Sequence, residues 1–361
     1  MSRPSPNPQV RVLIADDSAF MRTALSRMIA SDPDLWVAGT ASNGNEALEK
    51  TVSLDPDVIT LDVQMPGLDG IETLRCIMAQ FPRPVIMVSS VTLKDADSTF
   101  NALSAGAFDY VPKQLSTTSL DIIHIRDDLV AKIKAAGEAR RSRSYSGSLR
   151  RPPSAVRPSS SEVSPTTTAI IALGTSTGGP KALQDILPLL PADLSVPILV
   201  VQHMPAGFTR PFAERLDRLC SLSVCEASNG ETARPGVVYI APAGLHMTVE
   251  RSTDSRAMIR LSDQPEKQLH TPSVDVTMQS AASAFRSQAM GIIMTGMGSD
   301  GALGMKAIHQ AGGWTVGQDE HTCAVYGMPR ACAEQGILHR VVPLSQIPQQ
   351  ILQATRHRKL A

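Results

Sequence analysis

Hydrophobic and polar positions in the first part of the chain alternate between two spacings. Short apolar runs, typical of buried strands, are each followed by a longer segment whose apolar residues recur at helical spacing. The runs cover residues 10–15, 35–39, 57–61, 85–88 and 107–111. The helical segments cover residues 18–30, 43–53, 70–80, 95–105 and 119–133. Five such units predict an open parallel sheet with helices on both faces, in which functional residues follow the carboxyl ends of the strands.

The same alternation returns in the second part of the chain. Strands are predicted at residues 170–173, 196–202, 237–240, 290–294 and 314–317. Helices are predicted at residues 181–187, 208–219, 273–285 and 302–310. Closely spaced strand-like pieces between residues 237 and 261 indicate an antiparallel excursion at the sheet edge. We therefore expect a second doubly wound α/β domain.

A stretch rich in Ser, Arg and Pro separates the two parts. Residues 140–161 contain almost no large apolar side chain, so they bury too little area to offset the entropy of ordering. We predict a first domain over residues 10–133, a flexible linker over 134–168 and a second domain over 169–355. The arginines of the linker favour a solvated tether over a site for an acidic partner.

Composition narrows the function classes. Lys plus Arg and Asp plus Glu balance at 34 each, which gives no global charge for nucleic acid or a membrane surface. Residues 1–9 are polar and proline-rich, unlike a signal peptide, and no apolar run approaches the ~20 residues of a membrane span. The five cysteines are scattered, without a C-x-x-C pair. We expect a cytoplasmic protein with reduced thiols, no nucleic-acid partner and no insertion into a membrane.

Carboxylates gather at predicted strand ends of the first domain. Asp16 and Asp17 follow the first strand, and Asp62 follows the third. Three carboxylates at one sheet edge repel one another unless a hard cation lies between them, and oxygen ligands suit Mg²⁺. With the hydroxyl of Ser89 and the ammonium of Lys113 at the next two strand ends, they suit phosphoryl transfer onto an aspartate. The alternative is that Asp16 and Asp17 only cap the helix that starts at residue 18 and that Asp62 only lies in a turn.

The first domain resembles the flavodoxin-like receiver domain of two-component response regulators. The resemblance rests on Ala15-Asp-Asp-Ser18 and on residues 61–70, 87–90 and 106–113. It implies that Asp62 is the phosphoacceptor, that Asp16, Asp17 and Asp62 hold Mg²⁺, that Ser89 and Lys113 contact the phosphoryl oxygens, and that Tyr110 is an aromatic switch. A histidine kinase would be the phosphodonor. Gln114 stands where receivers usually carry proline, so this loop is expected to sit differently or respond less sharply.

A hydroxyl group follows the first strand of the second domain, in the turn Gly174-Thr-Ser-Thr-Gly-Gly-Pro180. At such a turn Ser176 is either a nucleophile or part of a phosphate cradle. His203 and Asp300 follow two other predicted strands and would complete a Ser-His-Asp triad, which is recognised by role and not by chain order. Glycines around Ser176 and Met297 free backbone N–H groups for an oxyanion.

Each element of this triad also has a structural interpretation. Taken alone, His203 is a packing residue and Asp300 a helix cap. Gly174-x-Ser176-x-Gly178 also matches the nucleophile elbow of α/β-hydrolases, but the order Ser, His, Asp and the lack of a His-Gly-Gly-Gly segment argue against that fold. The remaining histidines include His246, His270, His309 and His321, and we interpret them as surface or packing residues.

The second domain resembles the catalytic domain of bacterial chemotaxis protein-glutamate methylesterases. Matching blocks are residues 202–205, 239–242, 295–301, 317–320 and 326–329. The resemblance implies Ser176 as nucleophile, His203 as base, Asp300 as orienting acid, and Thr177 and Met297 at substrate and oxyanion positions. Thr175 stands where many relatives have Ala.

This second resemblance also implies a substrate and a mode of regulation. The substrate would be a glutamyl methyl ester on a chemoreceptor, or a receptor glutamine, hydrolysed without a cofactor and activated by phosphorylation. Two alternatives remain: a response regulator whose second half only binds a phosphate, and a DNA-binding regulator. No clustered basic face follows the linker, which disfavours the DNA-binding regulator.

Overall fold

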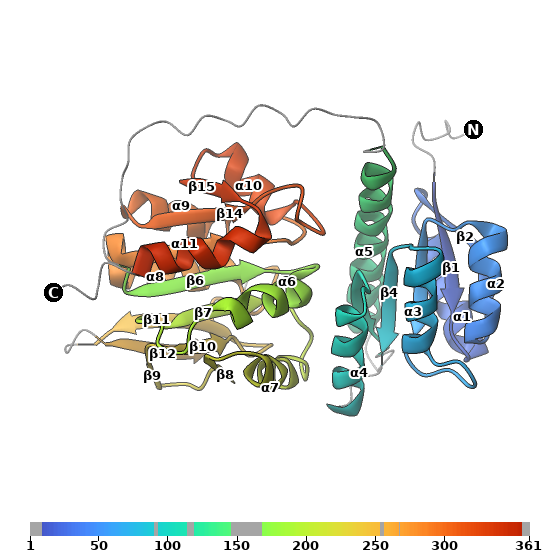
Figure 1. Cartoon of the computed structure of the whole chain (residues 1–361), viewed down its shortest axis with the longest axis horizontal. Coiled ribbons are helices and arrows are strands. Elements are labelled where there is room, and N and C mark those ends of the chain that lie inside the picture. Colours follow the sequence, from blue (N-terminus) through green and yellow to red (C-terminus); the bar gives the residue numbers. More distant parts are fainter. Residues whose placement is uncertain are drawn as a thin grey trace. The chain divides into compact units, whose positions relative to one another are not determined.

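The computed structural model describes residues 9–89, 93–113, 119–145, 168–252, 256–266 and 268–355. The chain forms two compact units, divided between Pro153 and Ser154 and coloured blue to green and light green to red in Figure 1. Gln114 and most of the predicted linker lie outside the described residues. We describe each unit by itself.

The first unit contains a parallel sheet of five strands, as the sequence predicts. The strands are β1 (Val10–Ala15), β2 (Leu35–Ala41), β3 (Val58–Asp62), β4 (Val85–Ser89) and β5 (Asp109–Pro112). Their order is β2-β1-β3-β4-β5, and every pair is parallel. Strands β3, β4 and β5 are buried at every position, which is why most of their residues are apolar. This order places the ends of β1 and β3 side by side.

Among the described residues of this unit, five helices accompany the sheet. They are α1 (Ala19–Ala30), α2 (Gly44–Leu54), α3 (Gly70–Gln80), α4 (Leu93–Ser104) and α5 (Ser119–Tyr145). The side chains of Ser18, Asn43 and Asp69 accept hydrogen bonds from the first turns of α1, α2 and α3, so each of these helices begins at a capping residue. Helix α1 packs against α5, and α3 packs against both α2 and α4.

Helix α5 is longer than the sequence pattern predicts. The prediction that it ends at residue 133 was wrong, because the helix continues to Tyr145. Ala136 is fully buried, and Arg140 forms ion pairs with Asp55 at 3.1 Å and Asp57 at 3.3 Å. The first residues of the predicted linker are therefore helical. Carboxylates that are far away in the sequence but close in space offset the mutual repulsion of the basic side chains.

The second unit is built on a parallel sheet of seven strands. The strands are β6 (Ile170–Thr175), β7 (Ile198–Gln202), β8 (Ser223–Glu226), β10 (Val237–Ile240), β13 (Ala289–Ile293), β14 (Trp314–Gln318) and β15 (Arg340–Val342). Their order is β15-β14-β13-β6-β7-β10-β8. The five inner strands are those that the sequence predicts. The edge strands β8 and β15 were missed because they are short and partly exposed.

A small antiparallel sheet confirms the predicted excursion. It contains β11 (His246–Arg251), β12 (Ala257–Ser262) and β9 (Thr232–Ala233), in the order β11-β12-β9. Met247 and Ile259 from this sheet share one hydrophobic core with Met278 and Phe285 of the helix that follows. The excursion therefore packs on the domain and brings the chain back to the main sheet.

Helices and short 3₁₀ turns complete the second unit. The helices are α6 (Gly179–Ile186), α7 (Thr209–Leu219), α8 (Val274–Phe285), α9 (Ala302–Gln310), α10 (Met328–Glu334) and α11 (Ile347–Thr355). The 3₁₀ turns are η1 (Leu187–Leu189), η2 (Arg286–Gln288) and η3 (Leu344–Gln346). Helix α8 packs on β6, β11, β13 and α9. In the described part of the chain, no helix has the length and apolar character to cross a membrane.

Candidate functional site

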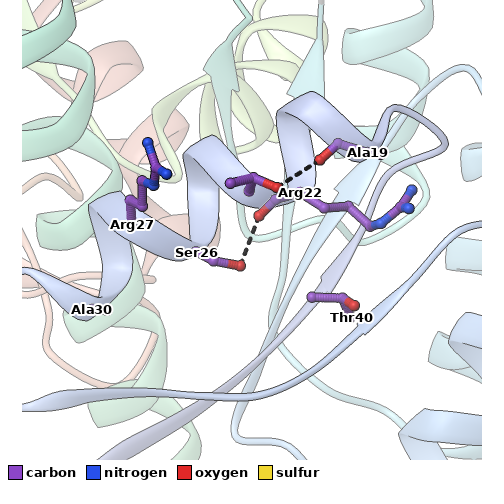
Figure 2. A pocket seen from close by; sticks show the side chains of 7 residues that line it. Ala19, Arg22, Ser26, Arg27, Ala30 and Thr40 are labelled. Carbon is purple, nitrogen blue, oxygen red and sulfur yellow. Dashed lines mark hydrogen bonds between the residues drawn. The ribbon is translucent and has the colours of Figure 1, made fainter.

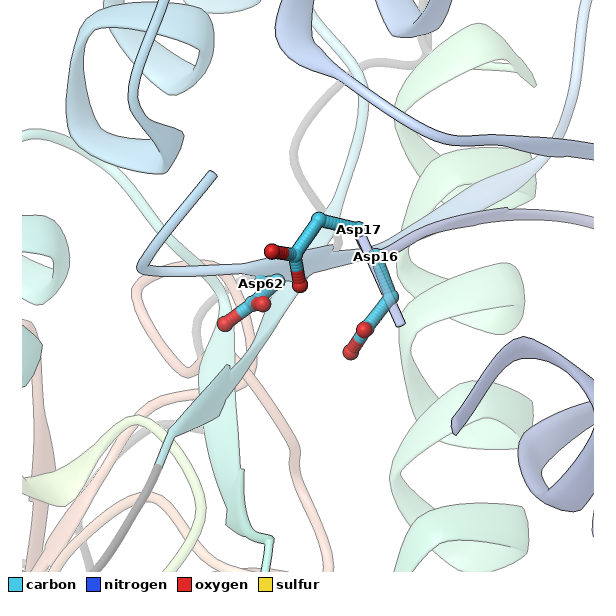
Figure 3. Close-up of side chains that lie close together, drawn as sticks. All are labelled: Asp16, Asp17 and Asp62. Carbon is cyan, nitrogen blue, oxygen red and sulfur yellow. The ribbon is translucent and has the colours of Figure 1, made fainter. Parts of the chain in front are cut away.

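Three carboxylates meet at the carboxyl edge of the first sheet. One oxygen each from Asp16, Asp17 and Asp62 lies within 4.8 Å of the other two, and Figure 3 shows the three side chains converging. They meet because β1 and β3 pair directly, with Ala15 opposite Leu61. Asp16 and Asp62 are buried, whereas Asp17 is exposed. Three carboxylates with one solvent-facing side are the oxygen donors that Mg²⁺ takes in proteins, so these residues fit that ion.

Lys113 completes this acidic cluster. Its Nζ lies 2.5 Å from Asp62 Oδ2 and 3.0 Å from Asp16 Oδ2. Burial raises the pKa of the Asp62 carboxyl, and the Asp16 charge adds to that rise, although Lys113 opposes it. Burial lowers the pKa of Lys113, but the two carboxylates outweigh it and the net shift is upward. One lysine therefore balances the cluster only in part.

The two remaining predicted residues of the first unit are buried on the neighbouring strands. Ser89 ends β4, and its Oγ accepts a hydrogen bond from Thr99 Oγ1 at 2.9 Å. Tyr110 lies in β5 and is almost fully buried. Lys132 of α5 donates to the Tyr110 carbonyl at 2.7 Å, and its ammonium lies 5.3 Å from the centre of the Tyr110 ring. The aromatic side chain is therefore packed inward, beside a cation.

An open hollow of about 500 Å³ lies elsewhere on the first unit, beside α1. Its lining residues are Ala19, Arg22, Thr23, Ser26, Arg27, Ala30 and Thr40. Figure 2 shows Thr40 across from the helix that carries Arg22, Ser26 and Arg27. The guanidinium of Arg22 donates to the carbonyls of Asp16 and Asp17. None of the residues predicted to be functional lines this hollow.

In the second unit, Ser176 follows β6 in a turn fixed by Thr295. The Ser176 backbone N–H donates to the Thr295 carbonyl at 3.0 Å, and the Thr295 hydroxyl donates to the Thr177 carbonyl at 2.9 Å. A Cβ at Gly296 would lie 2.9 Å from Ser176 Cβ, closer than side chains approach, so this position requires glycine. Thr177 is buried and Met297 is partly exposed. The two Gly-rich turns thus lie against each other.

His203 lies beside Ser176 because of the strand register. Thr175 pairs with Gln202 across β6 and β7, so the residues that follow them are neighbours. The Gln202 side-chain amide donates to the carbonyls of Ser176 at 3.0 Å and His203 at 2.9 Å. The buried amide of Gln202 therefore ties the two turns together. It was not singled out in the sequence, although it belongs to the Gln-His-Met-Pro block.

Asp300 follows β13 and reaches the His203 imidazole. His203 Nε2 lies 2.8 Å from Asp300 Oδ2, while the buried Nδ1 has no hydrogen-bond partner among the described residues. Burial opposes ionisation of Asp300, but the hydrogen bond and charge of His203, with backbone N–H groups of Val274 and Asp275, hold the pKa of Asp300 well below its usual range. The structure thus brings Ser176, His203 and Asp300 to neighbouring strand ends.

His270 lies at this site, although the sequence predicted no role for it. Its ring stacks on the His203 ring, with centroids 4.1 Å apart and planes at 24°. His246 is fully buried, as a packing residue should be, and His309 lies against His339 with centroids 4.7 Å apart. Because His270 comes from the loop after the antiparallel excursion, no strand-end pattern marked it.

Both units resemble known protein families. Residues 12–123 match the response regulator receiver domain and residues 171–351 match the CheB methylesterase family. A protein-glutamate methylesterase/protein-glutamine glutaminase from Oleidesulfovibrio alaskensis is 45% identical over 96% of this chain and 99% of its own length. One from Symbiobacterium thermophilum is 45% identical over 96% and 97%.

A solved structure supports the second unit directly. The CheB methylesterase catalytic domain of Thermotoga maritima is 38% identical, with a TM-score of 0.50 over 52% of this chain and 99% of that chain. The chain therefore belongs to the CheB methylesterase family and is a hydrolase that carries a response regulator receiver domain.

Proposed function

We propose that this chain hydrolyses glutamyl methyl esters on methyl-accepting chemotaxis receptors, deamidates receptor glutamines by the same route, and is activated by phosphorylation of Asp62. It would act in the cytoplasm, where the methylated receptor helices and a chemotaxis histidine kinase meet it. The observation that carries the hydrolytic part is the contact of His203 Nε2 with Asp300 at 2.8 Å, beside the turn that holds Ser176.

The hydrolysis would proceed through an acyl-enzyme. Ser176 Oγ attacks the ester carbonyl, and His203 accepts the hydroxyl proton. The ring nitrogen that accepts it is Nδ1, because Nε2 is engaged with Asp300. The same proton passes to the leaving methoxide, and methanol departs. Water activated by His203 then cleaves the acyl-enzyme to give glutamate and free Ser176; for a glutamine substrate ammonia leaves in place of methanol.

The Gly-rich turns would stabilise the charge that develops on the carbonyl oxygen. Backbone N–H groups near Thr177 and Met297 are our candidates for this contact, since both turns lie against Ser176. One such donor contributes roughly 3–4 kcal/mol of transition-state stabilisation. Asp300 keeps the imidazole oriented and stabilises its protonated form during transfer.

Phosphorylation would use the acidic cluster of the first unit. Asp16, Asp17 and Asp62 would hold a Mg²⁺ ion, and its positive charge would neutralise part of the phosphoryl charge. An Asp62 carboxylate oxygen would attack the phosphorus of the kinase phosphohistidine, so that the O–P bond of an aspartyl phosphate forms while the P–N bond breaks and the histidine side chain leaves. Lys113 would exchange its contact with Asp62 for a phosphoryl oxygen. Ser89 would hydrogen-bond a second phosphoryl oxygen, and Tyr110 would respond to that change as the switch.

Replacement of the nucleophile tests the hydrolytic proposal. We expect Ser176→Ala to remove methanol release from methylated receptor membranes while receptor binding persists, because only the attacking oxygen is lost. Ser223→Ala, at an exposed position that begins β8, is the matched control and should keep the full rate. Substantial esterase activity in Ser176→Ala would contradict the assignment.

Removal of the first unit tests the regulatory proposal. If the unphosphorylated first unit inhibits the second, a chain that begins near residue 166 should release methanol faster than the unphosphorylated full chain. A shift between mostly inhibited and mostly active populations needs several kcal/mol, within the reach of one added phosphoryl group. Equal rates for the two chains would argue against inhibition by the first unit.

A further inference from the structure

The Asp300 carboxylate is held by more than the imidazole that it orients. Its Oδ1 accepts hydrogen bonds from Ser273 Oγ at 2.9 Å and from the Asp275 backbone N–H at 3.0 Å. Its Oδ2 accepts from the Val274 N–H at 2.8 Å and contacts His203 Nε2 at 2.8 Å. The three donors other than His203 all belong to the start of the 12-residue helix α8, for which Ser273 is the N-cap.

We propose that Ser273 is a positioning residue of the hydrolytic site. It acts through Asp300, because its hydroxyl fixes the carboxylate rotation at which Oδ2 faces His203. The inference rests on the role proposed above for Asp300 and deepens it. Ser273 itself is almost fully buried, and its described hydroxyl contacts are to Asp300 and α8, so the role does not involve the ester.

The Ser273 hydroxyl bonds Oδ1 of Asp300, the carboxylate oxygen that does not contact His203. A carboxylate rotates about its Cβ–Cγ bond, and Oδ1 is held only by Ser273 Oγ and the Asp275 N–H among the described donors. Without the hydroxyl, Oδ1 keeps one of these two bonds. The Asp300 side chain is 12% exposed, so water can then compete for the free lone pair and widen the range of carboxylate orientations.

Ser273 is well placed for this role because its own contacts are fixed. Its backbone N–H donates to Nδ1 of the fully buried His246 at 3.1 Å. Burial lowers the pKa of His246, which favours the neutral ring that an Nδ1 acceptor requires. The Ser273 Oγ also accepts from the Val276 N–H at 3.4 Å, so its proton is left to point at Asp300.

Two helix starts also cap each other at this point. Asp300 precedes α9 and accepts N–H groups from α8, while the Asp275 carboxylate on α8 accepts the Gly304 N–H of α9 at 2.7 Å. A Cβ at Gly304 would lie 2.5 Å from Met278 Cβ, so the two helices approach as closely as a glycine allows. The orientation of Asp300 is therefore set by two packed helices, and Ser273 is the one side-chain hydroxyl bonded to its carboxylate among the described residues.

The test measures methanol release by the full chain from methylated receptor membranes. Ser273→Ala should lower kcat by about tenfold or more, as loss of a hydrogen bond to a charged group does, with KM unchanged. Ser273→Thr keeps the hydroxyl and should recover activity relative to Ser273→Ala. Ser280→Ala is the matched control, because it removes another hydroxyl of α8, bonded to the Thr277 carbonyl at 2.7 Å, and should stay within about twofold of the full rate.

A double-mutant cycle separates positioning from a general structural effect. If Ser273 acts through Asp300, then Ser273→Ala should cause no further loss in the Asp300→Ala background, where the full effect of Asp300 is already gone. An equal additional loss in that background would overturn the proposal. So would a Ser273→Ala variant with the full kcat. An Asp300→Ala variant with full activity would instead overturn the proposed triad, and the role of Ser273 with it.

Discussion

Three carboxylates in the first unit and one in the second, Asp300, lie at or after the carboxyl ends of parallel strands, and the protein compensates their charge in opposite ways. In the first unit Asp16, Asp17 and Asp62 lie close together, Lys113 contacts Asp16 and Asp62, and burial raises the pKa of Asp62. In the second unit Asp300 lies among hydrogen-bond donors, which hold its pKa well below the usual range despite burial. A carboxylate at this place in the fold can therefore either keep an uncompensated negative charge that favours cation binding or have its charge stabilised by hydrogen-bond donors.

That difference matches the two chemical roles that we propose. A carboxylate with incomplete compensation can attract Mg²⁺ and react with a phosphoryl group. A carboxylate saturated by donors is a poor nucleophile and instead fixes the geometry of its imidazole partner. Variants that remove the carboxylate charge or its neighbouring cation therefore test whether the two sites differ in this way.

The largest effect is expected from removal of the Asp300 charge. Asp300→Asn keeps the shape of the side chain but gives His203 an uncharged partner in the wrong hydrogen-bonding state, so kcat should fall by about 10⁴-fold. Methanol release under saturating receptor measures this, with Ser223→Ala as the control. A loss below tenfold would mean that the contact at 2.8 Å does not orient the base.

The next largest effects are expected to be stability changes of opposite sign in the two units. Asp300→Asn should destabilise the second unit by about 2 kcal/mol, because a charge-assisted set of hydrogen bonds is lost. Asp62→Asn should stabilise the first unit, since it removes a buried charge while Lys113 keeps its contact with Asp16. Hydrogen exchange of the full chain reports the two units separately. The same sign for both substitutions would contradict the comparison.

The pH dependence of these two changes follows from the direction of each pKa shift. The pKa of Asp300 lies below the unfolded value of 3.8, so its stabilisation is fully present above that pH and is lost as pH falls through the folded pKa. The pKa of Asp62 lies above 3.8, so the cost of its charge is present at neutral pH and disappears as pH falls towards 3.8. Hydrogen exchange at neutral pH and near pH 4 should show the Asp62→Asn benefit shrink while the Asp300→Asn cost persists.

The smallest effect is expected from the lysine of the first cluster. Lys113→Ala removes the positive charge 2.5 Å from Asp62 and 3.0 Å from Asp16, so the carboxylates should bind Mg²⁺ a few-fold more tightly. Calorimetric titration of the full chain with Mg²⁺ measures the change. Weaker binding would show that Lys113 organises the site more than it competes with the ion.

Much of this arrangement could be predicted from the sequence, because inner strands of parallel sheets are continuous apolar runs. Their ends located Asp16, Asp62, Ser176, His203 and Asp300 without knowledge of the packing. The receiver and methylesterase resemblance, and the two-domain fold with its antiparallel excursion, were confirmed. The roles of the individual site residues stay predictions.

What the sequence could not supply depends on tertiary contacts. Ser273 lies 27 residues before Asp300 and reaches it only because the excursion returns the chain to the start of α8. His270 precedes that helix in a loop whose path no local pattern encodes. The end of α5 was missed because a basic helix end and a basic linker have similar compositions. The ion pairs of Arg140 with Asp55 and Asp57, which distinguish the two, form only in the folded chain.

The central claim is that phosphorylation of Asp62 in one unit raises hydrolysis at Ser176 in the other. Its most direct test is the rate of methanol release from methylated receptor membranes, with and without a small-molecule phosphodonor and Mg²⁺, for the full chain and for Asp62→Asn. We expect the phosphodonor to raise the rate of the full chain by about tenfold or more and to leave Asp62→Asn unstimulated. Equal stimulation of the two chains, or none in the full chain, would contradict the account.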